Sequence, residues 1–237
     1  MENQSEWRAR IALACYFALV GGILLGSFIV AFVLIGMYGL RIDYTDLPFP
    51  IALISLPINE AIILGVTLLF AKYKGASLRE LGLKRASLRV LAIVSIIAMP
   101  LFLLALGIGV GEEVIFGEDP MAKDVEMAVM PRDSFQLVAM IALSLVLVGP
   151  CEELAFRGFV QRGFENSFGK TRGLLITSVL FGVMHGLNTL YAIVPVFAVS
   201  LVLGYVWQRT GGNTTASALM HGVYDSIAIA AAYFLSV

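Results

Sequence analysis

Long apolar runs alternate with short polar segments along the whole chain. Several runs approach or exceed the ~20 residues that a helix needs to cross a bilayer. None shows the two-residue alternation over about ten residues that a strand of a membrane barrel would require. We predict seven spans, at about 11–40, 51–71, 90–110, 135–162, 173–187, 191–208 and 214–235. The pattern therefore predicts an all-α fold, a polytopic membrane helix bundle.

The composition agrees with this fold class. Of the 237 residues, 59% are hydrophobic and only 14% are charged, which is more apolar surface than a soluble domain of this size can bury. The first apolar run is far longer than the core of a signal peptide, so we interpret it as a span. No linker or convincing repeat divides the chain, and we treat 1–237 as a single integral membrane domain. Residues 1–130 supply its N-terminal spans, and about 135–235 form its core.

Basic residues fall mainly on one side of the predicted spans. With the N-terminus in the cytoplasm, that side holds twelve of them: Arg8, Arg10, Lys72, Lys74, Arg79, Lys84, Arg85, Arg89, Arg162, Lys170, Arg172 and Arg209. Three lie on the other side, namely Arg41, Lys123 and Arg132. Because cytoplasmic loops carry the excess of Lys and Arg, we predict a cytoplasmic N-terminus and an external C-terminus.

Several shorter features complete this outline. Trp7 precedes the first span, where an interfacial aromatic residue would sit, and Met121–Met130 is predicted to form a short interfacial helix. Cys15 and Cys151 both lie in apolar runs and are interpreted as small hydrophobic residues rather than a disulfide pair. The chain has neither a polybasic tail nor a basic patch interleaved with aromatic residues. Nucleic acid is therefore not expected as a partner.

The segment Pro150–Arg157 places two carboxylates and an arginine within the fourth apolar run. Charges at bilayer depth are expensive and rarely face lipid. On a helix, Glu153 and Arg157 are four residues apart and share a face, whereas Glu152 points about 100° away. Pro150 should kink the helix just before the carboxylates. One carboxylate can thus pair with arginine while its neighbour stays free to react; an ion pair that only holds helices together is the alternative interpretation.

The only two histidines of the chain follow this segment. His185 lies on the predicted fifth span, and His221 lies on the seventh, four residues before Asp225. At 1.5 Å per residue, Glu152, His185 and His221 lie about 15, 20 and 12 Å from the basic ends of their spans. We therefore expect them to meet in a polar cavity between the fourth, fifth and seventh spans. A lone membrane histidine more often forms a hydrogen bond between helices.

These groups suit the hydrolysis of an amide bond. Glu152 in an apolar cavity is a candidate general base for a water molecule. The histidines and Asp225 can polarise a carbonyl and stabilise an oxyanion. Glu152, His185 and His221 would also suit a Zn²⁺ site of two histidines and one carboxylate. The sequence is equally compatible with a zinc enzyme and with a metal-independent mechanism.

The order Glu-Glu-x-x-x-Arg, Phe-x-x-x-His, His-x-x-x-Asn/Asp on successive membrane helices resembles the CPBP family of CAAX proteases and bacteriocin-processing enzymes, also called the Abi or type II CAAX prenyl endopeptidase family. The resemblance covers about 135–235. It implies Glu152 as the water-activating base, Glu153 and Arg157 as its support, and His185 as a contact of the water. His221 and Asp225 would form the oxyanion site. Ras-converting members have Asn where this chain has Asp225, so Asp225 must be protonated to donate a hydrogen bond or must instead orient His221.

The resemblance also implies a substrate class and a location. We expect a multi-pass protein of a prokaryotic cell membrane that cuts a membrane-anchored or prenylated protein, as CAAX-processing members do. Two alternatives from other classes are a proton- or cation-coupled transporter and a non-catalytic immunity or scaffold protein. Glu60, in the second span, fits a transport pathway; it can also pair with Arg157, line the same cavity, or lie near a hydrated interface. We predict that Glu60→Gln harms activity less than Glu152→Gln.

Overall fold

The computed structural model describes residues 7–39, 51–119 and 130–235, and within them all regular structure is helical. Three long helices come first, α1 (Ala9–Tyr38), α2 (Ile51–Tyr73) and α3 (Leu88–Phe116). One interrupted helix follows, made of α5 (Ser134–Leu143), η1 (Ser144–Val148), α6 (Gly149–Glu153), η2 (Leu154–Gln161) and α7 (Arg162–Phe168). The chain continues through α8 (Lys170–His185), η3 (Leu190–Ala192), α9 (Ile193–Arg209) and α10 (Thr214–Leu235).

Six helical segments of the described chain are long and apolar enough to cross a membrane, which confirms a polytopic bundle. They correspond to the predicted spans one to four, six and seven. The predicted fifth span corresponds to α8, which has only 16 residues and falls short of the usual crossing length. The count of seven therefore stays a prediction. The predicted interfacial helix Met121–Met130 lies, except for its last residue, outside the described residues.

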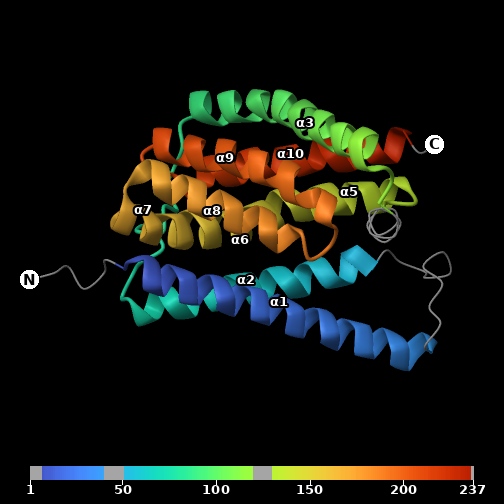
Figure 1. Cartoon of the computed structure of the whole chain (residues 1–237), viewed down its shortest axis with the longest axis horizontal. Coiled ribbons are helices and arrows are strands. Elements are labelled where there is room, and N and C mark those ends of the chain that lie inside the picture. The colour runs from blue at the N-terminus through green and yellow to red at the C-terminus, as the bar shows by residue number, and fades with distance from the viewer. Residues whose placement is uncertain (1–6, 40–50, 120–129, 236–237) are drawn as a thin grey trace, which may run out of the picture.

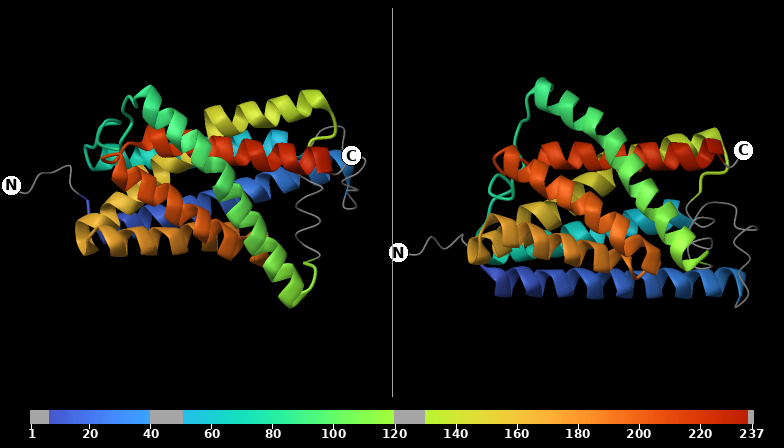
Figure 2. Two further views of the ribbon diagram at one scale, coloured as in Figure 1. Left: turned by 90° about the horizontal axis from the view of Figure 1, so that it is seen from above. Right: turned by 45° about the horizontal axis from the view of Figure 1, so that its top comes forward.

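The helices are arranged in layers around the interrupted helix. α1 and α2 lie side by side on one face of the bundle, and α3 lies on the opposite face, against α9 and α10 (Figure 1). α3 crosses its neighbours obliquely (Figure 2). The interrupted helix lies between these outer layers and contacts both α10 and the α1–α2 pair, whereas α8 packs against α9 and the interrupted helix. The segment with the candidate catalytic residues is thus enclosed by helices on several sides.

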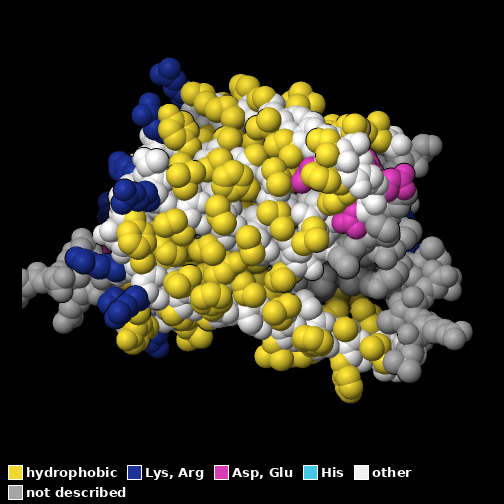
Figure 3. Space-filling model, in the orientation of Figure 1, with side chains coloured by type: hydrophobic (Ala, Val, Ile, Leu, Met, Phe, Trp, Pro, Cys, Tyr) yellow, Lys and Arg dark blue, Asp and Glu magenta, His cyan; other side chains and the backbone are white. Residues whose placement is uncertain are grey.

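The surface separates charge in the way expected of a membrane protein. On the face seen in Figure 3, Lys and Arg gather at the end where α1 begins, whereas acidic side chains lie toward the other end. A broad apolar surface lies between them. Large apolar side chains of the described residues, such as Phe28, Phe32 and Leu103, are more than half exposed. The predicted cytoplasmic N-terminus rests on the same positive charges and stays a prediction.

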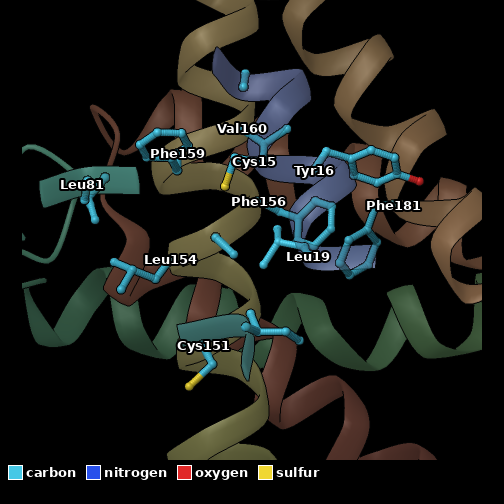
Figure 4. Close-up of a cluster of buried hydrophobic side chains, with 14 of the residues drawn as sticks. Cys15, Tyr16, Leu19, Leu81, Cys151, Leu154, Phe156, Phe159, Val160 and Phe181 are labelled. Atoms are coloured by element: carbon cyan, nitrogen blue, oxygen red, sulfur yellow. The ribbon is translucent and has the colours of Figure 1, made fainter. Parts of the chain in front are cut away.

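A hydrophobic cluster holds α1 against the interrupted helix and α8 (Figure 4). Phe156 and Phe159 of η2 are fully buried within it, and Phe156 packs edge-on against both Tyr16 and Phe181. Trp7 belongs to the same cluster and is only 2% exposed. Its ring stacks on Phe159 at 4.5 Å, and its Nε1 donates to the Phe159 carbonyl at 2.8 Å. Trp7 therefore packs in the protein interior and does not face the lipid interface as expected.

The interrupted helix departs from α geometry on both sides of the two carboxylates. Pro150 has no N–H, so the carbonyl one turn earlier lacks its usual donor. The helix widens to π geometry at η1, where the Gly149 N–H donates to the Ser144 carbonyl five residues back. A second π segment, η2, begins directly after Glu153. Such wide turns are rare in helices and concentrate at functional sites.

Glycines let α10 approach the interrupted helix closely. A Cβ added at Gly222 would lie 2.7 Å from the Ser144 carbonyl oxygen and 2.9 Å from Leu145 Cα. A Cβ added at Gly149 would lie 2.6 Å from the Ala218 carbonyl oxygen. Small residues at such crossings allow membrane helices to pack backbone against backbone. This contact places His221, the neighbour of Gly222, beside the carboxylates of α6.

Candidate active site

A cavity of about 640 Å³ lies beside α6. Its lining side chains come from α1, α2, the interrupted helix, α8 with the turn after it, and α10. Four of the predicted site residues line it: Glu152, His185, His221 and Asp225. Most of the remaining lining is apolar and includes Ile23 of α1 and Leu56 of α2. Polar groups therefore converge at one part of a largely apolar chamber, which is the usual character of a small-molecule or peptide site.

Glu153 and Arg157 lie behind this cavity as a fully buried ion pair. Arg157 Nη1 is 3.0 Å from Glu153 Oε1, and neither side chain is exposed. Arg157 Nη2 also donates to the Ser200 hydroxyl at 3.0 Å, and the guanidinium lies 4.7 Å from the ring centroid of Phe181. The pairing expected from the four-residue spacing is confirmed. Its burial is stable only because the arginine and the carboxylate compensate each other.

The same carboxylate also holds His221. His221 Nδ1 lies 3.1 Å from Glu153 Oε1 and donates its proton to that oxygen. A carboxylate bonded to one ring nitrogen fixes the orientation of an imidazole and leaves its other nitrogen for the reaction. Arg157, Glu153 and His221 therefore form one continuous chain across three elements. The spacing within the sequence predicted the first link of this chain but not the second, because residues 153 and 221 meet only through tertiary packing.

His221 Nε2 points toward the two carboxylates of the cavity. It lies 3.9 Å from Glu152 Oε2 and 3.7 Å from Asp225 Oδ2. Glu152 is 7% exposed, and its Oε2 has no hydrogen-bond partner among the described residues. Glu152 and Glu153 thus differ sharply although they are adjacent. Glu153 is tied to two cationic or donor groups, whereas Glu152 faces the cavity.

His185 reaches the cavity from the C-terminal end of α8. Its Nδ1 lies 2.9 Å from the Phe181 carbonyl oxygen, one turn earlier. Because a carbonyl only accepts, Nδ1 carries the proton, and in the neutral ring Nε2 is an acceptor. Gly182 lets α8 pack closely on α9, since a Cβ there would lie 2.7 Å from the Ile193 carbonyl oxygen. The ring of His185 is thus oriented by a hydrogen bond to the preceding turn of α8, and α8 is positioned by its packing against α9.

Glu60 of α2 is a further carboxylate in the wall of the same cavity. Its side chain is only 2% exposed, and Oε2 has no hydrogen-bond partner among the described residues. Among the places expected for Glu60, the structure supports the cavity wall. Arg157 is engaged by Glu153 and Ser200 instead.

Comparison with known families covers the same part of the chain. Residues 134–227 match the family described as type II CAAX prenyl endopeptidase, Rce1-like. Over these residues the chain is similar to the CAAX protease family. The match spans under half of the 237 residues, begins with α5 and ends within α10. No curated protein and no solved structure gave a significant match.

This similarity suggests a protease embedded in the membrane and favours this function over a transporter or a scaffold. The matched segment includes all six predicted site residues: Glu152, Glu153, Arg157, His185, His221 and Asp225. It excludes α1, α2 and α3, and therefore also Glu60. The contribution of α2 to the cavity comes from the structure alone.

The described residues do not fit a metal site. No group of three or more His, Cys, Asp or Glu side chains within the described ranges is arranged to hold a metal ion. His185 Nδ1 and His221 Nδ1 are both engaged by other groups, which leaves Nε2 of each ring for the cavity.

Proposed function

We propose that this protein is an intramembrane endopeptidase in which Glu152 activates a water molecule for attack on a peptide bond. The substrate is membrane-associated, and the family match favours a C-terminal, CAAX-type site in a prenylated protein. The observation that carries the proposal is the different setting of two adjacent carboxylates. Glu153 is locked between Arg157 and His221, whereas Glu152 lines the cavity and accepts no hydrogen bond at Oε2 from the described residues.

In the proposed reaction, Glu152 accepts a proton from water as the water oxygen attacks the scissile carbonyl carbon. His185 Nε2 accepts a hydrogen bond from the same water and orients it. His221, protonated on both nitrogens, donates from Nε2 to the oxyanion, while Glu153 and Asp225 offset its positive charge. Arg157 keeps Glu153 in place and acts through it. The apolar lining of the cavity strengthens these charge interactions because it lowers the local dielectric constant.

The proposal is tested with purified protein in detergent and a farnesylated peptide that ends in a CAAX box. Wild-type protein should release the last three residues, and Glu152→Gln should lower the rate by about 10³-fold, within the usual range for loss of a general base. Glu113→Gln is a matched control, because Glu113 is an exposed carboxylate at the far end of α3. Equal cleavage by wild type and Glu152→Gln would refute the role of Glu152.

The same peptide without its lipid separates the substrate class from the chemistry. If prenylated proteins are the substrates, the unlipidated peptide should have a higher KM, because the apolar lining of the cavity no longer binds the lipid. Equal KM values for the two peptides would contradict a prenylated substrate and would leave the role of Glu152 intact.

A further inference from the structure

Glu60 is a buried carboxylate that the reaction described above does not use. Its side chain is 98% buried, its Oε2 has no hydrogen-bond partner among the described residues, and it lines the cavity together with Glu152 and His221. A carboxyl group in such a place is expensive unless a proton or a donor offsets its charge. Asn59, the preceding residue of α2, lines the cavity too. Because burying this carboxyl group is costly, we expect Glu60 to have a function in the cavity.

The position of Glu60 separates it from the residues of the family match. Glu152, His185, His221 and Asp225 all lie within 134–227, whereas Glu60 lies on α2. The remaining α1 and α2 side chains of the cavity are mostly aliphatic, such as Ile23 and Ile63. A peptide in the cavity would therefore have Glu152 and the histidines on one wall. On the wall formed by α1 and α2, Glu60 is the ionisable group among the described residues.

Peptide hydrolysis needs a second proton transfer, and the residues on the wall with Glu152 and the histidines are poorly suited to provide it. As the C–N bond breaks, the leaving nitrogen must gain a proton, because an amide anion is a very poor leaving group. Glu153 is tied to Arg157 and His221, and His185 Nδ1 is bonded to the Phe181 carbonyl. His221 is committed to the oxyanion, and Glu152 has just taken a proton from water on the attacking side.

We propose that Glu60 is a second catalytic residue, the acid that protonates the leaving amine from the wall formed by α1 and α2. This inference rests on the proposed peptidase function. Water loses one proton to Glu152 and forms the new C–O bond. The tetrahedral intermediate then collapses, the C–N electron pair stays on nitrogen, and nitrogen takes the proton of Glu60. The proton held by Glu152 returns to Glu60 through water in the cavity, so that the sum is amide plus water giving carboxylic acid plus amine.

The test compares two substrates with the same acyl part. One has the natural peptide bond, and the other has an activated aryl ester in its place, whose leaving group needs no proton. Glu60→Gln should lower kcat for the amide about 10²-fold, as is usual for loss of a general acid, and should change kcat for the ester by no more than about twofold. Glu60→Asp, which keeps an acid, should restore part of the amide rate.

Glu152→Gln is measured beside it and should impair both substrates, because both reactions need the activated water. Equal losses on amide and ester with Glu60→Gln would overturn the assignment, as would no loss on either. If Glu152→Gln leaves both rates unchanged, the proposed function fails, and that outcome is distinct from a failure of the Glu60 assignment alone. Thermal unfolding of Glu60→Gln in detergent, compared with the Glu113→Gln control, identifies any loss caused by misfolding.

Discussion

The N-terminal helices and the family-matched segment, residues 134–227, meet different physical requirements. α1, α2 and α3 are long helices of ordinary geometry, whose many exposed apolar side chains suit contact with lipid. The segment 134–227 contains two π-helical stretches and the fully buried Glu153–Arg157 pair. Lipid-facing helices must only be apolar and long enough. Reactive groups must be held within fractions of an ångström.

The comparison shows where the site depends on accurate packing. In the family-matched segment, Gly149, Gly182 and Gly222 have no room for a Cβ, whereas Gly65 of α2 and Gly107 of α3 have nothing nearby. The two regions are nevertheless connected, because Trp7 packs on Phe159 and Glu60 completes the cavity. The loss of stability and activity should therefore be largest for substitutions in the family-matched segment. It should be smaller for substitutions at the contacts between the two regions, and smallest for those on the lipid-facing surface.

Arg157→Met should have the largest effect. It leaves Glu153 buried without its cation, which should cost about 3–5 kcal/mol of stability and abolish cleavage. Thermal unfolding in detergent followed by circular dichroism, together with peptide cleavage, measures both losses. Arg89→Met is the matched control, because Arg89 is exposed at the beginning of α3.

A double variant tests the cause of that loss. Glu153→Gln combined with Arg157→Met removes both charges and should recover part of the stability but not the activity, because His221 loses its carboxylate. A double variant that is less stable than Arg157→Met would show that pairing is not the reason for the effect.

Gly222→Ala should come next. The added methyl group would lie 2.7 Å from the Ser144 carbonyl oxygen, so α10 must shift at a cost of about 1–3 kcal/mol. His221 moves with it, and cleavage should fall about 10-fold or more. Gly65→Ala, which meets open space, should leave cleavage unchanged. A fully active Gly222→Ala would contradict the role assigned to this crossing.

Trp7→Phe tests the connection between the two regions. It removes the 2.8 Å hydrogen bond to the Phe159 carbonyl but keeps an aromatic ring for stacking. The expected loss is about 1 kcal/mol, measured as a lower unfolding temperature with nearly normal cleavage. A loss of activity as large as that of Gly222→Ala would mean that the connection positions the site directly.

Phe32→Leu should have the smallest effect. Phe32 of α1 is 78% exposed, so the substitution exchanges one lipid-facing apolar side chain for another and should change stability by less than about 0.5 kcal/mol. Phe156→Leu is the matched change in the buried cluster and should be clearly destabilising, since Phe156 is fully buried. Similar unfolding temperatures for these two variants would remove the distinction between the regions.

Local spacing explains what the sequence could predict. The membrane runs, the Glu153–Arg157 pair and the closeness of His221 to Asp225 all follow from helix periodicity, and the structure contains each of them. Pro150 correctly indicated an irregular helix beside the carboxylates, although the irregularity takes the form of π-helical turns. Interactions between residues a few positions apart on one helix can therefore be predicted before the fold is known.

Contacts between distant residues could not be predicted in the same way. The bond between His221 and Glu153 depends on two glycines that let α10 approach, and Glu60 reaches the cavity only because α2 packs beside α6. The interfacial position predicted for Trp7 was wrong because its partner, Phe159, lies 152 residues away in the sequence. The short α8 shows a related limit, since an apolar run of the sequence does not reveal that its helix has only 16 residues.

The size of the cavity bears on how hydrolysis proceeds in an oily medium. A volume of about 640 Å³ is far larger than the ~10–15 Å³ that a single water molecule needs. A peptide segment that enters the cavity can therefore leave space beside it for water. In the proposed reaction each catalytic cycle consumes one water molecule, and a chamber with polar groups can hold that molecule inside an otherwise apolar bundle.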